Sequence, residues 1–142
     1  MKKTWSCLVV IIISLAGCAV GVQPVNYGKE NCELCKMTIM NNQFAAELIT
    51  KKGKVFKFDD IHCMALYIKN VPVDKENINQ LFITDFSMPG KFINAGNAVF
   101  IKSENLRSPM EGNIAAFENA DSAKKYLMQF DAADIKLSSI IP

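Results

Sequence analysis

The order of hydrophobic and polar residues predicts a β-hairpin in the first half of the chain. Residues 44–50 are mostly apolar or β-compatible, residues 51–54 have the composition of a turn, and residues 55–58 again have strand propensity. A later apolar run at residues 81–86 predicts a third strand, although Asp85 interrupts it. The pattern therefore predicts two paired strands followed, after a gap, by one more.

A helix is predicted in that gap. Asp59 can accept hydrogen bonds from the first free amides of a helix, and Asn70 and Pro72 end the helical pattern. Between them, apolar residues recur at helical spacing, namely Ile61, Met64, Ala65 and Ile68. The first unit is thus predicted to run strand, strand, helix, strand.

The second half of the chain repeats this plan after a shift of 59 residues. The shift places residues 112–117 over residues 53–58 and Tyr126-Leu127 over Tyr67-Ile68. Chance similarity between two amphipathic hairpin-helix units is the alternative explanation. The repeat predicts strands at residues 98–101, 113–117 and 135–137, and a helix at residues 122–130 with Asn119 or Asp121 as its cap. The predicted fold class is α+β, with ββαβ units at residues 32–90 and 91–142.

Residues 1–17 have the composition of an export signal. Lys2 and Lys3 precede the apolar run at residues 7–13, which is too short to span a bilayer comfortably. The run ends in Leu15-Ala16-Gly17-Cys18, which resembles the lipobox of bacterial lipoproteins. An ordinary secretory signal followed by a cysteine is the alternative.

On the lipoprotein interpretation, Cys18 carries the lipids and Cys7 is lost with the signal. Several acyl chains would hold the protein stably on a membrane. Residues 18–31 contain Gly21, Pro24 and Gly28 with few large apolar residues, so they are predicted to be a flexible tether. The protein is therefore expected in the cell envelope, with the outer membrane facing the periplasm preferred because Ala19 offers no obvious retention signal.

The charge balance excludes nucleic acid as an expected partner. The full chain has 16 Lys and Arg against 14 Asp and Glu, a net charge of +2. Loss of residues 1–17 removes two basic residues, Lys2 and Lys3, and no acidic one, which leaves 14 of each sign. A surface without excess positive charge or a basic stripe lacks the electrostatic footprint of nucleic-acid binding.

The segment Cys32-Glu33-Leu34-Cys35-Lys36-Met37 carries the most specific chemistry of the sequence. Its two thiols and its thioether are soft donors, which prefer the same few metals. His62 and Cys63 add an imidazole and a third thiol from the predicted helix. A Cys-x-x-Cys pair is also compatible with a disulfide, structural or redox-active, so that alternative stays open.

The other candidate donors have ordinary structural interpretations as well. Met37 could fill the core, the commonest use of methionine, but its place beside Cys35 favours a ligand role. Met64 shares the apolar helical face and is assigned to the core. His62 and Cys63 lie off that face; a lone histidine is more often a surface residue than a ligand, and a free cysteine is often only a small buried residue.

Three motifs together resemble the NosL family, lipoproteins that assist assembly of nitrous oxide reductase. They are Cys-x-x-Cys-x-Met-x-Ile at residues 32–39, Phe-Asp-Asp-Ile-His-Cys-Met-x-x-Tyr at residues 58–67, and Ser108-Pro109-Met110, all behind a lipobox. The resemblance implies two related ββαβ units, a fold also likened to that of organomercurial lyase, and binding of Cu(I) for delivery to a multicopper enzyme. Lys36 departs from the family pattern, since many members have glycine there.

Met110 enters the ligand set through this resemblance. Pro109 restricts Ser108 to extended conformations and Gly112 permits a sharp reversal, so the loop is expected to hold the Met110 side chain in a set direction outside the core. The side chain would then either contact a partner protein or act as a thioether donor over copper held by residues 32–37. The resemblance favours the donor.

Three function classes follow from these residues. The first is a Cu(I) metallochaperone without enzymatic activity, with nitrous oxide reductase or its assembly machinery as partner. The second is a thiol-disulfide oxidoreductase using Cys32 and Cys35, which lacks the βαβ surroundings of the thioredoxin-like case. The third is a structural zinc module with Cys32, Cys35, His62 and Cys63 as a tetrahedral site. The predicted function is the first.

Overall fold

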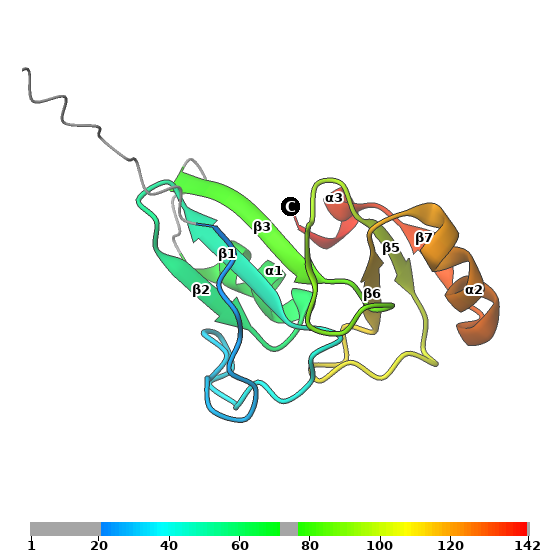
Figure 1. Ribbon diagram of the computed structural model, residues 1–142, viewed down its shortest axis with the longest axis horizontal. Helices are drawn as coiled ribbons and strands as arrows, with labels where there is room; N and C mark the ends of the chain where they lie inside the picture. The colour runs from blue at the N-terminus through cyan, green and yellow to red at the C-terminus, as the bar shows by residue number, and fades with distance from the viewer. Residues whose placement is uncertain (1–20, 72–76, 142) are drawn as a thin grey trace, which may run out of the picture.

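The computed structural model describes residues 21–71 and 77–141 (Figure 1). The first unit contains β1 (Ala46–Thr50), β2 (Val55–Phe58), α1 (Ile61–Asn70), β3 (Ile78–Thr84) and β4 (Phe92–Asn94). The second contains β5 (Val99–Lys102), β6 (Ile114–Phe117), α2 (Ala120–Phe130), β7 (Ala133–Ile135) and α3 (Leu137–Ile140). In Figure 1 the two units lie side by side, with α1 behind the first sheet and α2 at the far end of the second.

Both units have the predicted strand, strand, helix, strand order and the same sheet topology. The first sheet has the order β2-β1-β3-β4 and the second β6-β5-β7, and all their pairings are antiparallel. In each sheet the first strand of the unit is therefore central, with the second and third strands on either side of it. The prediction of an α+β fold with two related ββαβ units is confirmed.

The boundaries differ from the predictions where the elements are short. Neither β4 nor α3 was expected, because three or four residues are too few to show a hydrophobic period. Strand β7 begins at Ala133, before the predicted residues 135–137. Strand β3 runs from Ile78 to Thr84 rather than over residues 81–86, because the chain leaves the sheet at Asp85, whose buried carboxylate accepts other hydrogen bonds.

The residue that caps α1 is Asp60, and the prediction of Asp59 was wrong. Asp60 has extended backbone angles, and its side chain accepts a hydrogen bond from the Cys63 backbone N–H at 2.9 Å. A capping residue must directly precede the first helical residue, here Ile61. Its side chain can then accept a hydrogen bond from the backbone N–H of the third residue after it, here Cys63. In the second unit Asn119 caps α2, as one of the two predicted alternatives.

Residues 21–31, which fall in the predicted tether, pack against the first sheet. Val25 is buried, and the Gln23 backbone N–H donates to the buried Glu47 carboxylate at 3.0 Å. The Lys57 ammonium donates to the Pro24 carbonyl at 2.8 Å. These contacts place residues 23–25 against Glu47 of β1 and Lys57 of β2. The tether at residues 18–31 stays a prediction, and in its described part Gln23, Pro24 and Val25 are held by these contacts.

The second sheet separates two hydrophobic cores. Ile114 and Ala116 of β6 belong to the core beneath α1, whereas Ala115 and Phe117 belong to the core beneath α2. This alternation is the period of two that a strand imposes on its side chains. Because both faces of β6 are covered, all four of its residues are buried, and the two units share one continuous body.

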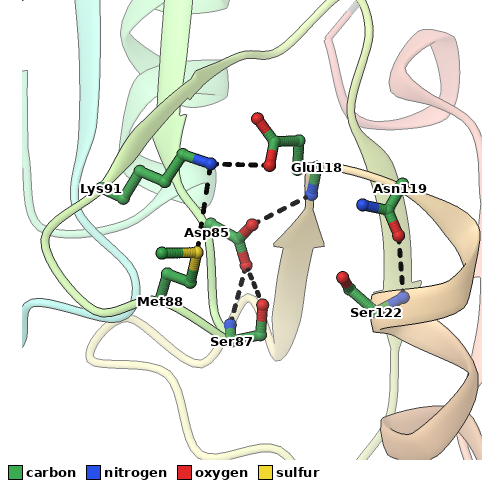
Figure 2. A network of polar contacts seen from close by, with 7 residues as sticks. All are labelled: Asp85, Ser87, Met88, Lys91, Glu118, Asn119 and Ser122. Carbon is green, nitrogen blue, oxygen red and sulfur yellow. Dashed lines mark hydrogen bonds and ion pairs between the residues drawn. The ribbon is translucent and has the colours of Figure 1, made fainter.

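Asp85 joins the two units at the end of β3. It pairs with Ala116 of β6 in an isolated parallel bridge, and its carboxylate accepts hydrogen bonds from the Glu118 N–H at 3.2 Å and from Ser87. Figure 2 shows the hydrogen bonds of the Asp85 carboxylate with Ser87 and Glu118, together with the ion pair between Lys91 and Glu118, which is 2.6 Å long. Asp85 is 1% exposed, so these hydrogen bonds lie inside the protein, where water does not compete for them. They therefore help to fix the orientation of one unit against the other.

The predicted signal peptide and the lipid attachment site at Cys18 lie outside the described residues. In the described part of the chain, no helix is long and apolar enough to cross a membrane.

Candidate metal centre

The Cys-x-x-Cys segment forms a tight loop held at the edge of the first sheet. The Cys32 N–H donates to the Met37 carbonyl at 2.8 Å, and the Ile39 N–H donates to the Glu30 carbonyl at 2.9 Å. The Glu33 N–H donates to the Lys57 carbonyl of β2 at 2.8 Å, and Ile39 is fully buried. The loop is thus anchored at its base and by its neighbour strand, which fixes the directions of both cysteine side chains.

Lys36 closes this loop in a left-handed conformation. Its φ is 62°, and its N–H donates to the Cys32 carbonyl at 3.0 Å. Glycine adopts such angles without strain, whereas a residue with a Cβ pays a steric cost. This explains why glycine suits the position and shows that lysine is accommodated there with the turn intact. The lysine side chain is 68% exposed and forms an ion pair of 3.2 Å with Glu33.

The third thiol comes from the first turn of α1. Cys63 is fully buried, and the sulfur atoms of Cys32, Cys35 and Cys63 all lie within 4.8 Å of one another. All three are free thiols. The structure therefore brings together three predicted ligands from two segments that lie about thirty residues apart in the sequence. The distances between their sulfur atoms are short enough for a single soft metal ion to bind all three.

The surroundings favour a thiolate at Cys32. The Cys63 thiol donates a hydrogen bond to the Cys32 sulfur, and the backbone amides of Cys35 and Asp59 also donate to it. Together they lower the pKa of Cys32 from 9.0 to about 5, against the effect of burial. Cys32 is thus an anionic donor at neutral pH, and a metal that binds there has no proton to displace from it.

The other two thiols keep their protons more firmly. The hydrogen bond to Cys32 holds the proton of Cys63 and raises its pKa, and burial acts in the same direction. Burial also raises the pKa of Cys35. Next to Cys32, burial and the thiolate charge raise the pKa of the Asp59 carboxyl to about 6, and its Oδ1 atom has no hydrogen-bond partner. Of the three thiols, one is therefore a thiolate before a metal binds, and a cation would displace the protons of the other two.

Met37 and His62 are more exposed than Cys32 and Cys63. The Met37 side chain is 57% exposed, and the hydrogen bonds of this residue are made by its backbone. The Met37 carbonyl accepts from the Cys32 N–H, and the Met37 N–H donates to the Cys35 sulfur. His62 is half-buried and lines a cleft with Lys69 and Glu111. Among the described residues, neither a histidine nor a carboxylate belongs to the group of three thiols.

Met110 lies in the loop of residues 103–113 between β5 and β6. Contrary to the expectation of a tip outside the core, its side chain is half-buried and packs against the same hydrophobic cluster that contains Cys32 and Cys63. The Met110 N–H donates to the Asp60 carboxylate at 3.2 Å. The loop thus places this thioether on the first unit, on the side where α1 begins.

Asp60 is a buried neighbour of the thiol centre that the sequence did not identify. It directly precedes a helix whose third residue is Cys63, and that spacing alone could have identified it as the cap. Its contacts to the second unit come from residues 48 and 50 positions later, Ser108 and Met110, and carry no local signal. The prediction of Met64 as a core residue is confirmed, since it is fully buried.

Comparison with known proteins gives a consistent result. Residues 25–140 match the family model described as NosL. Among solved structures, the crystal structure of the copper chaperone NosL from Shewanella denitrificans is similar, with a TM-score of 0.72 and 21% sequence identity over 86% of this chain and 96% of that one. At this identity the likeness shows the fold. A search of curated proteins finds no match.

Proposed function

The chain belongs to the NosL family, and from this membership and its three-thiol centre we propose that it is an exported, lipid-anchored protein that binds Cu(I) and delivers it to nitrous oxide reductase. The observation that carries the proposal is the convergence of Cys32, Cys35 and Cys63 within 4.8 Å. Thiolates are soft ligands that suit Cu(I), and they bind Zn²⁺ as well, so the family and the neighbouring thioethers of Met37 and Met110 decide for Cu(I) in this proposal. The protein would act as a carrier, with copper as its cargo and without catalysis.

The exposed and half-buried donors suit a site that must also release its ion. Met37, a neutral thioether, is 57% exposed directly beside Cys35, and Cys35 itself is accessible in part. Neutral thioethers hold Cu(I) less firmly than thiolates do, so a partner's ligands could enter on this side while Cys32 and Cys63 still retain the ion from within. Met110 would complete the site from the second unit.

The alternatives fit the geometry less well. A structural zinc site takes four protein ligands, but His62 does not belong to the thiol group in the described structure. A dithiol oxidoreductase needs an accessible low-pKa thiolate to attack its substrate. Here the thiol with the lowered pKa, Cys32, is fully buried, and the accessible Cys35 has a raised pKa.

Metal analysis and a competition titration test the proposal. Protein purified reduced and without oxygen should take up about one Cu(I) per chain from a competing chelator. Substitution of Cys32, Cys35 or Cys63 by serine should each lower this affinity by at least about tenfold, because each removes an inner ligand. Met128→Ala is the matched control, since this methionine is 78% exposed on α2.

Two results would contradict the proposal. A firmly held zinc ion that Cu(I) does not displace would favour the structural zinc module. Unchanged Cu(I) affinity in all three serine variants would place the copper elsewhere. Delivery is tested separately, by measuring the transfer of copper from the loaded protein to metal-free nitrous oxide reductase. The control replaces the loaded protein with the same amount of Cu(I) bound to the chelator.

A further inference from the structure

One buried carboxylate ties the thiol centre to the second unit. Oδ1 of Asp60 accepts the hydrogen bond of the Cys63 N–H at 2.9 Å, while Oδ2 accepts from the Ser108 hydroxyl at 2.9 Å and from the Met110 N–H at 3.2 Å. Asp60 is 1% exposed. A buried carboxylate with several charge-assisted hydrogen bonds is a strong and rigid junction. The amides of Cys63 and Met110 are therefore fixed to the same group.

The loop that carries Met110 is shaped to reach this junction. In the first unit, residues 51–54 connect the equivalent strands, whereas in the second unit the connection runs over residues 103–113. The longer loop is braced internally, since the Asn113 N–H donates to the Ser108 Oγ at 2.9 Å and the Glu111 N–H donates to the Ser108 carbonyl at 3.2 Å. Ser108 thus relays the Asp60 contact into the loop backbone.

The loop also lies directly on the first turn of α1. A Cβ atom added to Gly112 would come within 2.6 Å of the Cβ of His62, so only glycine permits this close approach. The His62 side chain therefore contacts the loop at Gly112 and limits its movement toward α1. With Asp60 on one side and His62 on the other, the loop has little freedom to move away from α1.

We propose that Asp60 is a positioning residue that holds the Met110 backbone on the side of the cluster that contains Cys32 and Cys63, and so presets the Met110 thioether as a Cu(I) donor to the three-thiol centre. The inference rests on the proposed function, because it assumes that Met110 is a ligand. The physical reason is preorganisation: a methionine side chain on a free loop would have to be ordered when the ion binds, and a fixed loop has already lost that freedom. Outer residues that orient ligands typically change metal affinity by about 10- to 100-fold.

Asp60→Asn isolates this role from helix capping. An asparagine oxygen can still cap α1, as Asn119 does for α2 at the same distance of 2.9 Å. Its amide nitrogen then replaces Oδ2 and cannot accept from the Met110 N–H, while the Ser108 hydroxyl can reverse its role and accept. The variant should bind Cu(I) about tenfold more weakly. Asn119→Ala, which removes the cap of the other helix, should keep wild-type affinity despite its loss of stability.

A double-mutant cycle with Met110→Leu decides whether Asp60 acts through Met110. Leucine keeps volume and apolarity but lacks the sulfur. We expect Asp60→Asn to cost about tenfold in affinity when Met110 is present and less than about twofold when leucine replaces it. Amide hydrogen exchange of the metal-free protein gives a second readout, since exchange at the Met110 N–H should be faster in Asp60→Asn.

The outcomes separate this inference from the proposed function. Equal costs of Asp60→Asn in both backgrounds, or a neutral Met110→Leu, would overturn the role of Asp60 while copper binding by the wild-type protein stands. Unchanged exchange at the Met110 N–H would overturn it as well. Failure of the wild-type protein to bind Cu(I) would overturn the proposed function and this role with it.

Discussion

Asp60 and Asn119 lie 59 residues apart in the chain and cap equivalent helices in the same way, each accepting a backbone N–H at 2.9 Å from the third residue that follows. That third residue is Cys63 in the first unit and Ser122 in the second. The repeat therefore supplies the same backbone position twice, but only the first unit places a thiol there. The second unit instead reaches the start of α1 through its longer loop, where Ser108 and Met110 donate to Asp60.

The titration of Cys32 should be visible in the reduced, metal-free protein. The hydrogen bond from Cys63 lowers the pKa of the Cys32 thiol to about 5, so the ultraviolet absorbance of one thiolate should already be present at pH 7. In Cys32→Ser this absorbance should be absent at neutral pH. The measurement is a pH titration of the thiolate absorbance under anaerobic conditions.

The same shift gives the pH dependence of stability its sign. The unfolded chain binds the Cys32 proton below its usual pKa of 9.0, whereas the folded protein has released it down to about 5. The stability contributed by this thiolate is therefore complete above about pH 9 and lost as the pH falls through about 5. Urea unfolding between pH 6 and about 9 should show stability rising with pH, less so in Cys32→Ser. A parallel slope in Cys32→Ser would contradict the lowered pKa.

Lys36→Gly should stabilise the protein. Lys36 has a φ of 62°, where a side chain costs about 1–2 kcal/mol and glycine costs less, partly offset by the greater freedom of glycine in the unfolded chain. The net gain should be about 0.5–1 kcal/mol in the free energy of unfolding, measured by urea denaturation. The affinity for Cu(I) should change little, because no donor is lost.

Lys52→Gly provides the matched control for Lys36→Gly. Lys52 is also exposed and lies in a turn, but its φ is not among the positive ones of the described chain. Glycine there should be neutral or slightly destabilising. Equal effects of the two substitutions would show that the left-handed angle of Lys36 carries no cost.

Asp85→Ala should loosen the junction between the two units. The substitution leaves the Glu118 N–H and the Ser87 N–H without their buried acceptor, and the cost should be about 2–3 kcal/mol of unfolding free energy. Thermal unfolding followed by circular dichroism measures it. Asp134→Ala, at an exposed position of β7, should cost less than about 0.5 kcal/mol, and a similar loss in both variants would count against the junction.

The proposed lipid anchor predicts a clear fractionation result. Cys18→Ser should move the protein from the membrane to the soluble fraction, because the acyl chains on this residue would supply the membrane affinity. Cys7→Ser is the control, since Cys7 lies in the predicted signal and should not affect attachment. Membrane fractions probed for both variants give the answer; retention of Cys18→Ser in the membrane would reject the lipoprotein interpretation.

The sequence by itself determined the order of the longer elements and the inventory of donors, but not the short elements β4 and α3. Helix α1, the hairpin β1–β2 and the repeat of 59 residues follow from local hydrophobic periods and from capping residues, which act over three or four positions. The Cys-x-x-Cys-x-Met segment, Cys63 and Met110 are recognisable because soft side chains in fixed spacing leave a pattern in the sequence. The family could be named from these motifs for the same reason.

Only the tertiary structure decided which donors meet. Cys63 and His62 are neighbours in the chain, but successive residues of a helix point about 100° apart, so one faces Cys32 and the other faces the loop of residues 103–113. The burial of Asp60 and Asp85 depends on partners from the second unit. Such contacts arise when distant segments pack, and nothing in the local sequence records them. For that physical reason the separation of His62 from the three thiols and the contacts of Asp60 with Ser108 and Met110 became visible only in the folded chain.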